Sequence, residues 1–467
     1  MGIVLVNMTL LKIAPFPIEP LLILWYDWGE VVLMKNDVRN NFTGYLSLFS
    51  DDWDCVFALN SYTVTVTPFT DNAVNALTKR TFESKSEIES HFIYGVSDKG
   101  KQVAFLCKTG FNFTYSDSGV ISANFPVAMI IQGAKRDNLN KFKRITFYGG
   151  IVNFLKHPES CIQHDFEENT NWINDIKFKR SDEFTTNYDL TLNKIKCRLV
   201  CSCLKAADEN RIGQGAILCR LHSTFCFDFD KEQPIEDIDK YYTYAQQLFQ
   251  FCSGRENVGF TIELSVPSNF KGESCTMSAQ VRHRDGFRDY ANDMLHLQTK
   301  IVFNSLGDKL PRLIELFSNK ETTPLLKFFP TENRNSNVVF NRQYLDLCIA
   351  VEREFYLNNK VNTPKKNCLK DKEPTARQKI RRLYKYFEDD IEQISSSPLS
   401  SKKMNDGISK FLKTRDSSAH SIGNIEDDTD IFFRLRLTVY LSVLQRAGYT
   451  NEERVKILNG FGYFDRW

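Results

Sequence analysis

The spacing of apolar residues changes near residue 306, and this change constrains the fold more than any other feature of the sequence. Before it, several short runs alternate apolar and polar residues with a period of two, as strands do. The clearest runs cover 63–67, 103–107, 175–179 and 260–266. After it, apolar residues recur every three or four positions, as in helices. The sequence therefore predicts an α+β multidomain protein, with a large β-rich, sandwich-like N-terminal domain followed by an all-α helical bundle.

These patterns divide the chain into a β-rich domain at 1–305, a helical connector at 306–337 and a helical bundle at 338–467. In the β-rich domain only 237–251 has a convincing helical pattern, and a short amphipathic helix is expected at 309–317. The bundle should contain helices at 340–357, 376–394, 402–419 and 429–446. A capping-box sequence that begins at Thr450 and includes Glu453 predicts one more short helix.

The composition is typical of an ordinary globular protein rather than of a secreted or membrane protein. The 467 residues are enough for a sizeable core. The apolar N-terminal segment lacks a basic start and is interrupted by prolines, so we interpret it as a buried strand rather than a signal peptide. No run is long enough to span a membrane. The 12 cysteines form no Cys-x-x-Cys pair, and we expect reduced thiols in a cytoplasmic protein.

Basic residues concentrate in the helical part. From Asn333 onward 24 Lys and Arg face 18 Asp and Glu, whereas the whole chain has a net charge of only +2. A solvated loop and helix face would account for such a run. The other interpretation is a surface that binds the phosphate backbone of RNA. Its candidate residues are Lys365, Lys366, Lys370, Arg377, Arg381 and Arg382.

Arg415 and His420 are the strongest candidates for chemistry. Cleavage of RNA without a metal needs a group of near-neutral pKa to move protons, which suits histidine. It also needs a fixed cation beside the phosphorus centre, which suits arginine. Five positions on an ideal helix separate the two side chains by about 140°, so they converge only if the helix loosens. The alternative is an exposed arginine and a capping histidine at a helix end.

The helical part resembles the HEPN ribonucleases, whose signature is Arg-x-x-x-x-His in the second half of a compact bundle. It is most similar to the ApeA-like group in the segments 346–353, 377–383 and 411–420, and the β-rich part resembles the ApeA N-terminal domain. The resemblance implies that Arg415 and His420 are the catalytic pair. Asp416 takes the polar position after the arginine, where the family most often has asparagine. Glu352 matches a recurrent acidic position, although an exposed carboxylate paired with a nearby arginine explains it equally well.

The resemblance also implies an anti-phage defence protein that acts by abortive infection. Its HEPN domain would be a metal-independent endoribonuclease that leaves 2′,3′-cyclic phosphate and 5′-hydroxyl ends. The implied partners are an RNA substrate, such as tRNA or another cellular RNA, a phage-derived trigger and further copies of the chain in a dimer or larger homo-oligomer. No cofactor, metal or membrane is implied. Two alternatives stay open: a non-catalytic module that binds RNA or nucleotides, and a carbohydrate-binding protein based on the β-rich part.

Other groups of polar residues have simpler explanations. His157, Cys161, His164 and Asp165 are of metal-ligating types, but they lack a second ordered pair and suit an ordinary loop. The three cysteines Cys197, Cys201 and Cys203 share strand parity, which predicts one buried strand face. The acidic residues at 426–430 suit a helix N-terminus.

Overall fold

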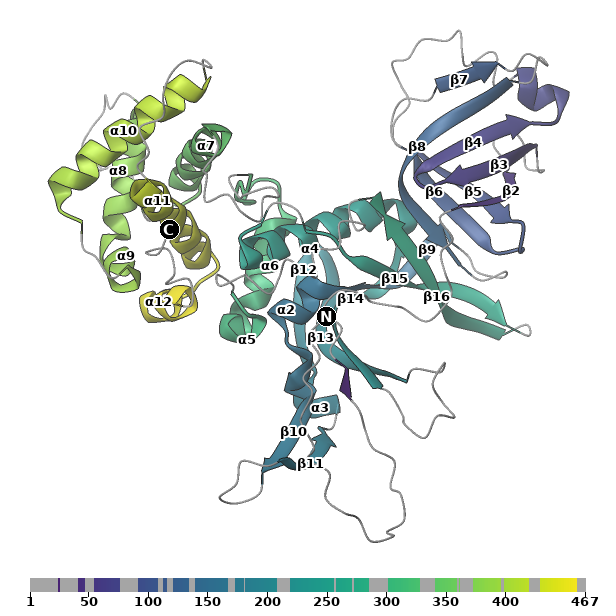
Figure 1. The fold of residues 1–467 in the computed structure, drawn as a ribbon, viewed down its shortest axis with the longest axis horizontal. Coiled ribbons are helices and arrows are strands. Elements are labelled where there is room, and N and C mark those ends of the chain that lie inside the picture. Colours follow the sequence, from purple (N-terminus) through teal and green to yellow (C-terminus); the bar gives the residue numbers. More distant parts are fainter. Residues whose placement is uncertain are drawn as a thin grey trace, which may run out of the picture.

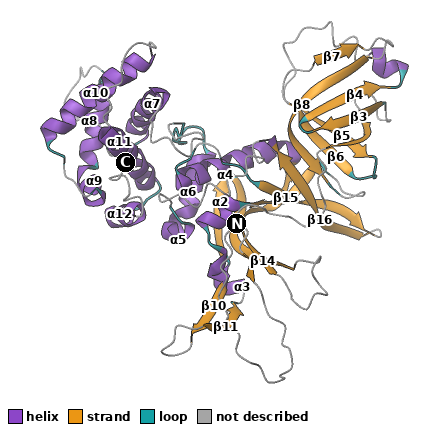
Figure 2. Cartoon of the chain, viewed as in Figure 1, coloured by secondary structure: helices purple, strands orange, loops and turns teal. Residues whose placement is uncertain are grey.

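The computed structural model places β structure first and helices after it (Figures 1 and 2). It describes residues 24–25, 41–46, 54–75, 91–107, 112–115, 121–133, 139–166, 173–179, 181–207, 219–255, 258–270, 273–284, 301–327, 341–358, 361, 373–395, 399–419 and 429–459. Among these residues, no helix has the length and apolar character needed to cross a membrane. The expected β-rich and helical regions are confirmed.

Six antiparallel strands close into a small ring at one end of the molecule, in place of the expected sandwich (Figure 1). They are β2 (Asn41–Leu46), β3 (Cys55–Asn60), β4 (Thr63–Pro68), β5 (His91–Ser97), β6 (Gln102–Cys107) and β8 (Ile121–Gln132). The first half of β8 pairs with β4 and its second half with β6, which closes the ring. The alternating apolar residues then point inward, where Phe57 packs edge-on against Phe42 and Phe105.

Gly44 lets the ring close at β2. A Cβ atom at this position would lie 2.2 Å from the Val96 carbonyl oxygen and 2.6 Å from the Phe57 ring. The neighbouring strands therefore approach closer than any side chain allows.

The second half of β8 continues into a second curved sheet of order β12-β13-β14-β9-β15-β16. Its strands are β9 (Lys141–Tyr148), β12 (Thr186–Leu192), β13 (Ile195–Ala207), β14 (Cys219–Pro234), β15 (Thr261–Phe270) and β16 (Glu273–His283). Smaller additions are β1 (Leu24–Trp25) beside β14, β7 (Asn112–Tyr115) beside β8, and the hairpin of β10 (Ile162–Phe166) and β11 (Ile173–Phe178). The parity prediction is confirmed, because Cys197, Cys201 and Cys203 are all buried on β13.

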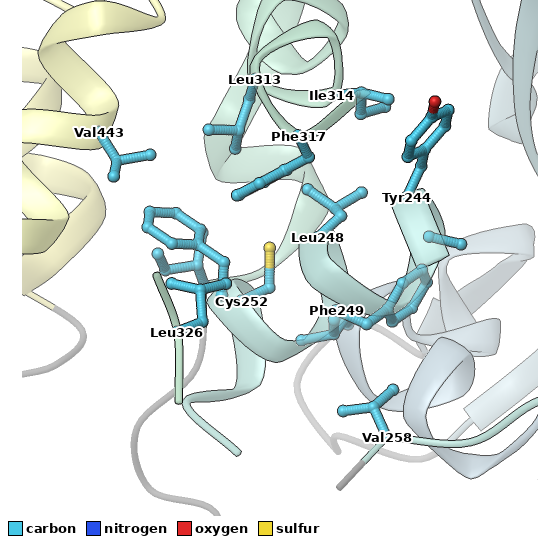
Figure 3. Close-up of a cluster of buried hydrophobic side chains, with 14 of the residues drawn as sticks. Tyr244, Leu248, Phe249, Cys252, Val258, Leu313, Ile314, Phe317, Leu326 and Val443 are labelled. Atoms are coloured by element: carbon cyan, nitrogen blue, oxygen red, sulfur yellow. The ribbon is translucent and has the colours of Figure 1, made fainter. Parts of the chain in front are cut away.

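Helix α4 (Ile238–Ser253) lies against this sheet and carries the predicted apolar face. The other helices of this region are α2 (Gly150–Leu155), the four-residue α3 (Ser181–Phe184), α5 (Phe303–Leu306) and α6 (Leu310–Ser318), with short 3₁₀ turns η1 (Pro158–Cys161), η3 (Ile235–Asp237) and η6 (Gly307–Lys309). The patterns predicted α4 and α6 and missed α2. Figure 3 shows Leu248 and Cys252 of α4 facing Leu313 and Phe317 of α6, close to Val443 of the bundle. One apolar core thus runs from the sheet into the bundle.

The bundle consists of α7 (Asn341–Leu357), α8 (Ala376–Tyr386), α9 (Glu388–Ile394), α10 (Ser401–Ala419), α11 (Thr429–Arg446) and α12 (Asn451–Asn459). One helix predicted at 376–394 is in fact two, because the chain breaks at the fully buried Phe387. Three acidic residues then occupy the first turn of α9, where the helix dipole favours them. The last of them, Asp390, accepts hydrogen bonds from Arg454 Nε and Nη2 at 3.0 and 2.6 Å.

Helix α11 connects the bundle to the β-rich part. Tyr440 donates a hydrogen bond of 2.9 Å to the Phe251 carbonyl, and the two rings lie 4.6 Å apart. Gly254 ends α4 with a φ of 66°, and a Cβ there would lie 2.5 Å from Arg436 Nη2. The left-handed backbone therefore favours glycine, and a side chain at this position would also displace the Arg436 guanidinium.

Candidate functional site

Helix α10 positions Arg415 through a buried stripe along its length. Met404, Ile408 and Phe411 are spaced by four and three residues and are all buried. Phe411 packs against Tyr344 of α7, with ring centroids 5.5 Å apart. Arg415 comes four residues later on the same side of the helix. Its side chain is therefore half-buried at the junction with α7, and 27% of its surface remains exposed.

Asp416 lies directly against Arg415. Its Oδ1 atom is 2.9 Å from Arg415 Nε, and 64% of its side chain is exposed. The predicted catalytic arginine is thus ion-paired with the residue that follows it. Arg415 Nε is itself buried and makes no hydrogen bond among the described residues, so this contact is an ion pair at an atom that is closed to solvent.

His420 lies outside the described residues. The described part of the bundle contains no histidine. The convergence of Arg415 and His420 therefore remains a prediction from the sequence.

Glu352 lies on α7, close to the same junction. Its Oε1 accepts a hydrogen bond of 3.5 Å from the Cys348 thiol, and its Oε2 is 3.5 Å from Lys379 Nζ on α8. Burial raises the pKa of Cys348 to about 12, Arg415 opposes the rise, and Glu352 and Asp416 add to it. These charges act on Cys348 together, so Glu352, Arg415 and Asp416 lie around one thiol. The partner of Glu352 is a lysine, not the arginine considered from the sequence.

Lys379 extends this cluster and was not among the candidates from the sequence. Its ammonium group lies 3.2 Å from Glu373 and 4.6 Å from the centroid of the Tyr356 ring. The Tyr356 hydroxyl also donates a hydrogen bond to Glu373. Burial lowers the pKa of Lys379, but the hydrogen bonds with Tyr356 and Glu373 and the charge of Glu352 outweigh it and raise the pKa overall. Lys379 therefore stays charged and fixes Glu352 in place. The only signal in the sequence was its position inside the basic run.

The proposed RNA-backbone residues are only partly described. Lys365, Lys366 and Lys370 lie outside the described residues. Arg377 donates a hydrogen bond of 2.6 Å to Ser409 of α10, and Arg382 is exposed on α8. Arg381 Nε is buried and has no hydrogen-bond partner among the described residues. Arg377 and Arg382 are therefore exposed on α8, whereas Arg381 is partly buried.

Comparison of the chain with protein-family models, curated proteins and solved structures gives no match.

Other candidates from the sequence give no metal site. No group of three or more metal-ligating side chains occurs in the part of the chain that the structure describes. Cys161 instead contacts Cys203. The acidic residues at 426–428 lie outside the described residues.

The junction of α7, α8 and α10 presents one fixed, partly exposed guanidinium, that of Arg415. Two carboxylates, Glu352 and Asp416, lie close to it. Such a group can bind a phosphate or stabilise a developing negative charge, because an arginine guanidinium is a planar, delocalised cation.

Proposed function

We propose that the C-terminal bundle is a metal-independent endoribonuclease of the HEPN type, in which Arg415 stabilises the transition state and His420 transfers protons. The observation that carries the proposal is the position of Arg415: half-buried at the end of α10, fixed by the packing of Phe411, and still partly exposed. A fixed cation of this kind is what cleavage at a phosphodiester requires. The products would be 2′,3′-cyclic phosphate and 5′-hydroxyl ends.

The setting of such an enzyme would be anti-phage defence by abortive infection, with the β-rich part controlling the bundle. The resemblance to ApeA-like proteins supports this setting. The contact of α11 with the end of α4 supports a connection between the two parts, because both share one apolar core. Further copies of the chain would complete the working site in a homo-oligomer.

Purified full-length protein tests the proposal directly. Total RNA and tRNA are incubated with the protein in EDTA, and the cleaved ends are sequenced. Wild-type protein should cut, whereas Arg415→Ala and His420→Ala should each lower the rate by at least about 10²-fold, as loss of a transition-state contact does. Lys413→Ala is the matched control, because Lys413 is an exposed cation on the same helix. Circular dichroism shows whether each variant remains folded.

The outcome against the proposal is cleavage that persists at the wild-type rate in His420→Ala. A second candidate, a non-catalytic module that binds RNA or nucleotides, is favoured by one observation: the Asp416 carboxylate lies 2.9 Å from Arg415 Nε and offsets the charge of the guanidinium. Under this second candidate no protein cuts RNA, and Arg382→Ala weakens RNA binding more than His420→Ala does.

A further inference from the structure

Two cysteines that are distant in sequence meet at the far end of the second sheet. Cys161 ends the 3₁₀ turn η1, and Cys203 lies on β13, 42 residues later. Their sulfur atoms are 3.3 Å apart. Both side chains are buried, with 2% and 5% of their surfaces exposed, in a small apolar cluster separate from the main core. A shift of roughly 1 Å would bring the sulfurs to bonding distance.

The surroundings of Cys161 favour its thiolate. The hydrogen bond with Cys203 lowers the pKa of the Cys161 thiol, burial opposes this effect, and the charges of Lys179 and Lys156 support it. The same hydrogen bond and burial raise the pKa of Cys203. Lys156 is itself buried, and its Nζ donates hydrogen bonds of 2.9 and 3.0 Å to the carbonyls of Cys201 and Phe184. Burial lowers the pKa of Lys156.

Other buried cysteines differ from Cys161. Burial raises the pKa of Cys197, Cys201 and Cys226 to about 12. Within the described residues, Cys161 is the one cysteine whose pKa is lowered. Reactivity follows thiolate character and exposure, and all four cysteines are similarly buried, so thiolate character and the neighbouring Cys203 sulfur at 3.3 Å distinguish Cys161 from the other three.

We propose that Cys161 and Cys203 form a redox-modification site that closes to a reversible disulfide when a hydroperoxide is present. The Cys161 thiolate attacks the peroxide oxygen, the O–O bond breaks, and a sulfenic acid and water (or an alcohol) result. The Cys203 sulfur then attacks the Cys161 sulfur, and the sulfenic oxygen leaves as water. Two electrons pass from the two thiols to the peroxide, and both thiol protons end in the leaving molecules.

Oxidation of the full-length protein by hydrogen peroxide tests this site. Protein is treated with peroxide, remaining thiols are alkylated, and peptides are mapped by mass spectrometry with and without dithiothreitol. The expected result is a cross-linked peptide pair containing Cys161 and Cys203, the loss of two alkylated thiols, and full recovery of both after dithiothreitol. The disulfide should also raise the thermal unfolding midpoint, since it closes a long loop of the unfolded chain.

Variants separate the pair from general oxidation. Cys161→Ser and Cys203→Ser should each abolish the cross-link, whereas Cys226→Ser, which alters a buried cysteine on β14, should retain it. Thermal unfolding of each variant checks its fold, and the wild-type peptide map decides the question even if a serine variant fails to fold. The proposal is overturned if peroxide leaves both cysteines alkylatable, if Cys161 is overoxidised without a cross-link, or if it pairs with a different cysteine.

Discussion

Replacing Arg446 by Met isolates the ion pair that holds α7 to α11. Glu354 of α7 is fully buried, and Arg446 Nε and Nη2 donate to its two carboxylate oxygens at 3.0 and 2.7 Å. Ser442 donates a further hydrogen bond of 2.8 Å. Arg446 Nη1 also donates to the Thr322 carbonyl at 2.7 Å, which joins the connector to the bundle. Methionine keeps much of the arginine's apolar length but removes all three of its hydrogen bonds.

The expected loss is about 3–5 kcal/mol in the free energy of unfolding, the usual cost of leaving one member of a buried pair without its partner. The carboxylate would keep only Ser442. Arg342→Met is the matched control, because Arg342 is 81% exposed on α7 and pairs with Asp346 at 3.5 Å. Such a surface pair contributes at most about 1 kcal/mol. Urea unfolding followed by far-ultraviolet circular dichroism compares the two variants.

The pH dependence gives a second, independent test. Burial raises the pKa of Glu354, and Arg446 and Ser442 oppose the rise. A carboxyl group with a raised pKa contributes stability below its unfolded pKa, and this contribution is lost as the pH rises through the folded pKa. Without Arg446, the pKa of Glu354 in the folded protein rises further. The deficit of Arg446→Met should therefore grow by about 1.4 kcal/mol per pH unit between the folded pKa values of the wild type and the variant.

A double-mutant cycle decides whether the pair is the cause. Glu354→Leu combined with Arg446→Met removes both charges, so the double variant should be more stable than the sum of the two single losses predicts. Additive losses, or a loss below about 1 kcal/mol for Arg446→Met, would refute the reasoning.

Two further predictions concern other parts of the fold. Glu453 pairs with Lys309 and caps α12, and these hydrogen bonds lower the pKa of Glu453 to about 2. The stability that this group contributes is present above its unfolded pKa and is lost as the pH falls from there toward 2. Glu453→Gln should therefore flatten the acid side of a stability–pH curve measured by urea unfolding, and an unchanged slope contradicts the assignment. Gly44→Ala places a methyl group against the Val96 carbonyl and should cost at least about 1–3 kcal/mol, measured by thermal unfolding against Thr43→Ala on the exposed side of the same strand.

Local patterns predicted most helices well, because each signal was complete within a few residues. The helix predicted at 429–446 matches α11 at both ends, and the capping box at Thr450 is present, with the Thr450 amide donating to Glu453 at 2.7 Å. The break at Phe387 was missed because its cause is tertiary. The first turn of α9 is fixed by Arg454 of α12, more than 60 residues away.

Closure of the β region also depends on contacts that no local pattern contains. Alternation predicted which residues of β4 point inward, whereas residues 103–107 of β6 are all buried, on both faces of the strand. Neither pattern shows that β8 pairs with both strands along its length. A sandwich and a ring require the same period-two pattern, so periodicity cannot distinguish them. The need for glycine at position 44 likewise depends on the position of Val96 in another strand.

In the candidate site, too, a contact between neighbours in the sequence is predictable, whereas a contact between separate helices is not. Arg415 and Asp416 are adjacent in sequence, and their pairing needed only a helix. Lys379 reaches Glu352 from another helix, so a charge in the basic run that suggested RNA binding is engaged within the protein. A basic run in sequence therefore overstates the charge available to a ligand when neighbouring helices supply carboxylates.

Helix α11 contacts both parts of the molecule, and these contacts are the strongest physical reason to expect that the two parts move together. On one side Tyr440 and Arg436 contact the end of α4, and on the other Ser442 and Arg446 hold Glu354 of α7. Glu352, two residues before Glu354, belongs to the cluster around Arg415. A shift of α4 against the bundle must break buried hydrogen bonds on α11 or carry α11 with it, since such bonds are costly to leave unmade. A movement of the β-rich part that carries α11 with it would reach α7, the helix that holds Glu352, and this path supports the proposal that the β-rich part controls the bundle.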